Sequence, residues 1–212
     1  MKKTSFIAAL VLLVGTAQAQ TLTGKWIVDQ NGCKFWDTSY DTSDRTITWS
    51  GKCVKGFAEG QGTLKMFEKG EPFGEYTGAM RSGKRHGNGT YTMANGDRYQ
   101  GGWVDGVRHG KGTHTWPIGN RYEGDWVAGK MHGKGTFTWV NGERYEGDWV
   151  AGKMHGKGNQ TVAGGIFRYQ GDFVGDKPHG FGVSTEGGIT TRDCWYENKK
   201  VRPANSPEEC RQ

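Results

Sequence analysis

One 14-residue stretch, YEGDWVAGKMHGKG, occurs twice without a change in this chain of 212 residues. The first copy runs from Tyr122 to Gly135 and the second from Tyr145 to Gly158, an offset of 23 residues. Repetition at a fixed period of this size predicts one supersecondary unit stacked on copies of itself. The chain is therefore expected to fold as an array, with functional surfaces that arise from repetition.

The repeat has a frame that we number from its tyrosine, Tyr122, as position 0. Glycine stands at +2, +7, +11 and +13, tryptophan at +4 and histidine at +10. A half copy places Trp195 at +4. The other copies, of which the first is degenerate, begin at Trp49, Tyr76, Tyr99, Tyr145 and Tyr169.

The spacing inside the frame predicts a β-hairpin. Positions 0, +2 and +4 share one parity, as do +11, +13, +15 and +17, and like-parity residues of a strand point to one face. Dipeptides such as Asn95-Gly96 mark the turn between repeats. A turn at residues 128–131 would pair +5 with +10 and +2 with +13, so that Trp126 lies over Gly133 and Tyr122 flanks Phe137.

The Tyr-x-Gly-x-Trp and Gly-Lys-x-His-Gly-x-Gly segments resemble the membrane occupation and recognition nexus (MORN) repeat, over roughly Thr46 to Thr190. The resemblance implies an all-β fold, an elongated single-layer antiparallel meander of stacked β-hairpins. It also implies a scaffold or binding module, with some members associated with membranes or with dimerisation. It carries over no catalytic residue, cofactor or defined ligand.

The first residues predict a secretory signal peptide. Two lysines precede an apolar run from Phe6 to Val14, and Ala17-Gln18-Ala19 follows as a cleavage site. The run is shorter than the roughly 20 residues that span a bilayer. We therefore expect an exported protein of bacterial type, periplasmic or secreted, with no transmembrane segment in the mature chain.

The cysteines are Cys33, Cys53, Cys194 and Cys210, and an even number in an exported chain favours disulfides. Three pairings are open, and the local one (33 with 53, 194 with 210) would staple each end of the array. A zinc site is disfavoured because no C-x-x-C occurs. The expected organisation is a signal peptide (1–19), an N-terminal cap (20–45), six MORN-like repeats (46–190), and a half repeat with a C-terminal cap (191–212).

An aromatic face is the first candidate surface. Its rings either fill their own face as a core or leave a groove for a peptide, a glycan or a second copy of the chain. The residues expected on this face are Tyr99, Trp103, Trp116, Tyr122, Trp126, Trp139, Tyr145 and Trp149.

A basic row along the hairpin turns is the second candidate surface. It is either a solvated edge or a site for an anionic partner such as a lipid head group. Other lysines, at +12, are expected to oppose aspartates at +3 of the same repeat, Lys134 with Asp125 and Lys157 with Asp148. The residues of the basic row are Lys84, Arg85, Arg108, Lys130, Lys153 and Lys177.

Histidines recur at +10, but equivalent positions lie about 10 Å apart when each repeat adds two strands, too far to share one zinc ion. A formal net charge of +6 does not by itself imply nucleic acid, and we expect none as a partner. The sequence contains neither G-x-S-x-G nor H-E-x-x-H. It therefore predicts a non-enzymatic, exported scaffold that binds a protein or self-associates. The alternative is a peripheral binder of anionic lipid or glycan through the basic row.

Overall fold

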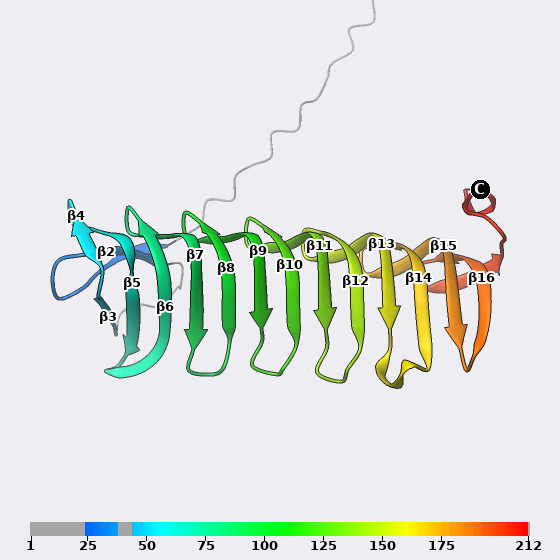
Figure 1. The fold of residues 1–212 in the computed structure, drawn as a ribbon, viewed down its shortest axis with the longest axis horizontal. Coiled ribbons are helices and arrows are strands. Elements are labelled where there is room, and N and C mark those ends of the chain that lie inside the picture. The colour runs from blue at the N-terminus through cyan, green and yellow to red at the C-terminus, as the bar shows by residue number, and fades with distance from the viewer. Residues whose placement is uncertain (1–23, 38–43, 212) are drawn as a thin grey trace, which may run out of the picture.

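The computed structural model describes residues 24–37 and 44–211. The predicted signal peptide lies outside these residues. The described part of the chain is an elongated row of β-hairpins, one beside the next (Figure 1). Its helical elements are two 3-10 turns, η1 (Ala163–Gly165) and η2 (Pro207–Cys210). No helix of the described residues is long and apolar enough to cross a membrane.

The strands at the N-terminal end are β1 (Lys25–Val28), β2 (Lys34–Asp37), β3 (Arg45–Trp49), β4 (Lys52–Val54) and β5 (Phe57–Glu68). The strands of the regular array are β6 (Glu71–Arg81), β7 (Lys84–Met93), β8 (Arg98–Val104), β9 (Val107–Thr115), β10 (Arg121–Val127), β11 (Lys130–Thr138), β12 (Arg144–Val150), β13 (Lys153–Thr161), β14 (Phe167–Val174), β15 (Lys177–Glu186), β16 (Ile189–Tyr196) and β17 (Lys199–Pro203).

Each strand from β5 to β16 pairs antiparallel with the next strand in sequence. β3 and β4 pair with opposite halves of β5, and β2 adds a short parallel contact, Lys34 to Phe57. The predicted antiparallel meander of stacked hairpins is therefore confirmed.

The turn inside each repeat is tighter than predicted. Val127 pairs with Lys130, which leaves only Ala128 and Gly129 in the turn. Their φ angles are 49° and 79°, and positive φ at both central residues defines a type I′ turn. This turn matches the right-handed twist of the paired strands, which is why two residues suffice where four were predicted. The predicted pairing of +5 with +10 is wrong.

A β-bulge then restores the predicted register farther from the turn. Asp125 pairs with His132, whereas Gly124 pairs with Gly135, so two residues of β11 have no partner on β10. One of them, Gly133, has a φ of 58°, a left-handed conformation that glycine adopts without strain. The predicted pairings of +2 with +13 and of Tyr122 with Phe137 are confirmed.

The bulge also changes which glycine each tryptophan meets. Trp126 pairs with Met131 in its own repeat and with Gly110 of the repeat before it. Gly133 pairs instead with Trp149 of the next repeat. The prediction that Trp126 lies over Gly133 is therefore wrong by one repeat. Each tryptophan connects two repeats, which ties neighbouring hairpins together.

A single column of aromatic rings forms the core of the array. Tyr122 meets Trp126 at 5.2 Å and Trp149 at 5.3 Å between ring centroids, with interplanar angles of 90° and 83°. Edge-to-face contacts of this kind are favourable for aromatic rings. The same alternation continues through Tyr76, Trp103, Tyr99, Trp126, Tyr122, Trp149, Tyr145, Phe173, Tyr169 and Trp195.

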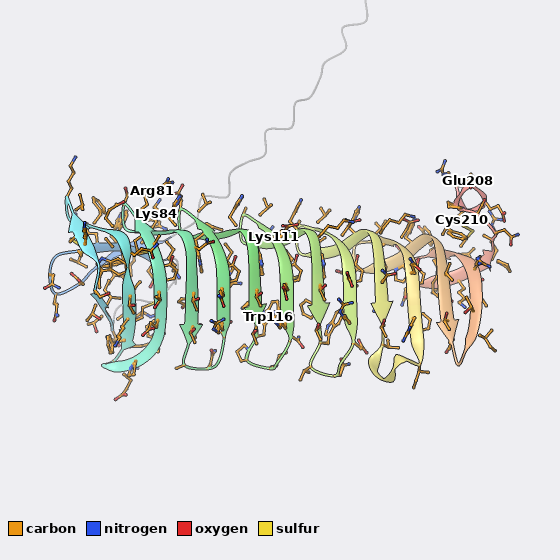
Figure 2. All side chains as sticks on the ribbon, viewed as in Figure 1. Arg81, Lys84, Lys111, Trp116, Glu208 and Cys210 are labelled. Carbon is orange, nitrogen blue, oxygen red and sulfur yellow. A yellow bond between two sulfur atoms is a disulfide. The ribbon has the colours of Figure 1, made fainter. Side chains whose placement is uncertain are left out.

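Disulfides close both ends of the array. Cys33 is bonded to Cys53, and Cys194 to Cys210, which is the local pairing among the three that the sequence allowed. Figure 2 shows Cys210 beside Glu208 in the short turn η2 at the C-terminal end. Each bond closes a loop of 20 or 16 residues, and loops of this size correspond to about 3 kcal/mol in the chain-entropy account.

Candidate functional site

The aromatic face is filled by its own rings over the centre of the array. Tyr122 is 0% exposed and Trp126 is 3% exposed. Their polar atoms are satisfied internally: Tyr122 Oη donates to the carbonyl of Asp125 at 3.0 Å, and Trp126 Nε1 to that of Gly112 at 3.1 Å. Tyr99, Trp103, Tyr145 and Trp149 are buried in the same way, and Trp116 and Trp139 are half-buried.

Burial also changes the acidity of the tyrosines. Desolvation raises the pKa of Tyr76 and of Tyr99 to about 12, against a smaller opposing effect of Arg85 and Arg108 respectively. These phenols therefore stay protonated at any physiological pH, as interior hydrogen-bond donors.

A polar groove runs along the face opposite the rings. It has a volume of about 1870 Å³ and crosses the array from Gln61 on β5 to Val183 on β15. Each regular repeat contributes side chains from +1, +12 and +14, such as Glu123, Lys134 and Thr136, and the backbone of its glycines. The groove therefore presents nearly the same surface about every 10 Å, the width of two strands.

The lysines of this groove pair with the next repeat. Lys134 Nζ lies 2.6 Å from Asp148 Oδ1, and Lys111 Nζ lies 2.6 Å from Asp125 Oδ1. The predicted partners within one repeat are wrong. The bulge leaves the residue at +12 without a partner in its own hairpin, and this residue pairs instead with the residue at +3 of the next repeat. Lys157 repeats the arrangement with Asp172. Such exposed pairs contribute about 1 kcal/mol or less.

The aspartate at +3 also holds the bulge. Asp125 Oδ2 accepts the backbone N–H of Lys134 at 3.0 Å. Burial acts to raise the pKa of Asp125, but the hydrogen bonds from Lys111 and from the Lys134 backbone outweigh it and hold the pKa below its usual value.

The structure divides the predicted basic row between the two faces of the sheet. Residues at +8 and +9 have opposite parity, so the lysines at +8 lie apart from the arginines at +9. Figure 2 shows Lys84 with Arg81 at the edge that carries the two-residue turns, whereas Trp116 lies toward the opposite edge. The +8 group is Lys84, Lys130, Lys153 and Lys177.

Of these four lysines, only Lys177 has an ion pair within the described residues. Lys177 Nζ lies 3.8 Å from Glu197 Oε2, and Lys84 Nζ lies 5.4 Å from the centre of the Trp36 ring. Lys130 and Lys153 have no ion-pair partner within the described part of the chain. Beside them runs a row of valines, 42–48% exposed: Val104, Val127, Val150 and Val174.

Arg85 and Arg108 instead lie on the aromatic face. The guanidinium of Arg85 is 5.0 Å from the centre of the Trp103 ring, and that of Arg108 is 4.9 Å from the centre of the Tyr99 ring. Sequence reasoning placed both on the turn edge because it assumed a four-residue turn. The Ser-Gly and Asp-Gly dipeptides before them signal a two-residue turn, which sets +9 against +4.

A buried histidine next to Arg108 was also missed. His114 is 4% exposed, and its Nδ1 lies 3.0 Å from Arg108 Nη1 while its Nε2 lies 2.7 Å from Asp97 Oδ1. Burial and the charge of Arg108 lower its pKa, against the hydrogen bond to Asp97. Its burial could have been predicted from its position in the repeat. His114 stands at +15, and the residue at +15 of the next repeat is Phe137, whose ring is buried.

The histidines at +10 lie in the strand pairs next to the bulges, as His132 opposite Asp125 shows. Among residues 24–37 and 44–211, no three side chains of His, Cys, Asp or Glu are grouped so that they could hold a metal ion.

Comparison with known families identifies repeats of one kind. The MORN repeat matches residues 76–98, 99–121, 122–144, 145–161 and 169–185. No curated protein matches the chain.

Proposed function

Because this chain carries five MORN repeats, we propose that it is an exported, non-enzymatic scaffold that binds a protein partner or assembles with copies of itself. MORN repeats are in general binding or scaffold modules, and the two disulfides suit a compartment outside the cytoplasm. The proposal includes the N-terminal signal peptide and the cap and repeat boundaries predicted from the sequence.

The observation that supports binding on the polar side is the contrast between the two faces. The aromatic face is occupied by its own rings, with Tyr145 0% exposed and Trp149 3% exposed. The opposite face offers the continuous groove of about 1870 Å³ and, at its turn edge, the row of half-exposed valines. A repeated polar groove beside apolar side chains suits an extended polypeptide or the edge of a second array.

The direct test is partner capture from the exported fraction, together with light scattering to measure self-association. A groove variant, Thr113→Arg with Thr136→Arg, places two large charged side chains among the groove residues. The matched control, Thr115→Arg with Thr138→Arg, alters the same two strands outside the groove. We expect the groove variant to lose the partner and the control to keep it. Absence of any partner and of self-association at micromolar concentration would overturn the proposal, as would equal binding by both variants.

An anionic lipid or glycan is the alternative ligand. The observation behind it is that Lys130 and Lys153 lie at the turn edge with no ion-pair partner in the described residues, beside exposed Val127 and Val150. Replacing both lysines by glutamate should then abolish co-sedimentation with anionic vesicles, and salt should weaken it. Binding that ignores both salt and the charge reversal would exclude this alternative.

A further inference from the structure

A small cavity opens on the aromatic face at the N-terminal end of the array. It has a volume of about 340 Å³ and is lined by three arginines, one aspartate and several apolar side chains. The arginines are Arg45, Arg85 and Arg108. The cavity is particular to these repeats because +9 is arginine only there. The later repeats have Met131, Met154 and Pro178 at the same position.

The guanidinium of Arg85 makes cation–π contacts with aromatic rings. Its guanidinium carbon lies 5.0 Å from the centre of the Trp103 ring, 5.1 Å from that of Tyr91 and 5.9 Å from that of Tyr76. Within residues 24–37 and 44–211 its guanidinium makes no ion pair and no hydrogen bond. A guanidinium over a ring uses its face, whereas its N–H donors lie at its edge. The donors of Arg85 are therefore free to bind an acceptor.

Arg108 adds a second charge that no carboxylate neutralises directly. Its Nη1 donates to His114 Nδ1, and Asp97 accepts from the other nitrogen of that imidazole. The carboxylate of Asp97 is thus hydrogen-bonded to His114, and only Nη1 of Arg108 takes part in this chain of hydrogen bonds. Burial lowers the pKa of Arg108, against the attraction of Asp97, and the repulsion of Arg85 lowers it further. Two positive charges that line one cavity favour an anion between or beside them.

The other cavity walls limit the kind of anion. Arg45 is already paired, with Asp37 at 3.4 Å and Glu68 at 3.1 Å. The carboxylate of Asp37 lines the cavity as well and disfavours a ligand with a double negative charge. Phe73 and Trp103 supply apolar surface. The volume corresponds to the small end of ligand pockets.

We propose that this cavity binds an organic monocarboxylate with an apolar body. The edge of Arg85 donates to the carboxylate, the charge of Arg108 reinforces the attraction, and the apolar body packs against Phe73 and Trp103. Planar, paired N–H donors match the geometry of a carboxylate. The ligand is either a free acid or the C-terminal residue of a polypeptide. This inference does not rest on the proposed scaffold function, because it concerns the opposite face of the sheet.

The test uses the full mature chain and phenylacetate as the probe. Binding is measured by titration calorimetry and by the NMR resonance of the Trp103 indole N–H. We expect saturable binding that shifts this resonance. Arg85→Met should weaken it at least tenfold, and this variant repeats the residue that Met131 and Met154 supply at the same position. Lys84→Met, one residue away on the other face, should leave the affinity unchanged. Phenylacetamide, which lacks the charge, should not bind.

Several results would overturn the proposal. These are no saturable binding of phenylacetate, equal binding by the Arg85→Met variant, equal binding of the amide, or tighter binding of inorganic phosphate. A peptide ending in phenylalanine, with a free or an amidated C-terminus, separates the two sources. Binding of the free-ended peptide alone supports a polypeptide end as the ligand. If phenylacetate binds and neither peptide does, the result supports a free acid as the ligand.

Discussion

Tyr122 lies against Gly135 so closely that a β-carbon on this glycine would stand 2.3 Å from the phenol oxygen. The two residues belong to paired strands, and Tyr145 repeats the contact with Gly158, where the nearest ring atom would be 2.4 Å away. Glycine at +13 is therefore a packing requirement of the aromatic column.

Gly135→Ala should destabilise the protein by about 1–3 kcal/mol, the usual cost of overpacking a close-packed site. The added methyl group would meet the buried ring of Tyr122, which is packed against the rings of Trp126 and Trp149. Urea denaturation measures the change in the free energy of unfolding. Thr136→Ala, next in sequence and on the other face, is the control and should change it by less than about 0.5 kcal/mol. Equal effects of the two variants would contradict the packing argument.

Ala128→Asn should stabilise the protein by about 0.5–1 kcal/mol. Ala128 has a φ of 49°, which costs an alanine about 1–2 kcal/mol, whereas asparagine before glycine is favoured in type I′ turns. Ala151, with a φ of 52°, offers the same test one repeat away. The double variant should show nearly additive gains in melting temperature. A loss of stability in both single variants would show that the turn is not of this type.

The protein should become less stable as the pH falls into the mildly acidic range, because the buried His114 resists protonation. Its folded pKa is lowered, so between the unfolded value of about 6.5 and the folded value the unfolded chain binds the extra proton. The free energy of unfolding should fall with decreasing pH in that window, by up to about 1.4 kcal/mol per pH unit.

Denaturation at pH 7 and below measures this slope. His114→Gln, which keeps a donor and an acceptor at the site, should remove it. His109→Gln, on an exposed position of the array, should not. A slope that survives in His114→Gln would assign it to another group.

The array should unfold in alkali. Burial raises the pKa of Tyr76 and Tyr99 to about 12 and also raises that of Tyr122, Tyr145 and Tyr169. Above the unfolded value of about 10 the unfolded chain loses these protons first, so stability falls as pH rises. Absorbance at the phenolate band should show the buried tyrosines ionising together in one cooperative unfolding step. Gradual, independent ionisation of all the tyrosines would contradict the buried hydrogen-bonded arrangement.

Much of the hairpin could be predicted because its signals are local. Alternation assigned Tyr122, Trp126 and Phe137 to one face, and the pairing of Tyr122 with Phe137 followed from it. The bulge at Gly133 could not be predicted from alternation, since an extra residue changes the register without changing composition. The error in turn length had a functional consequence, because it placed Arg85 and Arg108 on the wrong face.

The period and parity of the repeat were sufficient to specify a row of hairpins with aromatic rings on one side, because strand alternation depends only on neighbouring residues. Stacking of the hairpins decided the rest. It chose one of three cysteine pairings, joined each lysine at +12 to the following repeat, and surrounded Arg85 with rings from two repeats. These contacts join residues far apart in the chain, and their geometry depends on the bulge, the turn and the twist together. The duplicated 14-residue segment therefore encodes the hairpin, whereas the groove and the arginine cavity exist only in the assembled array.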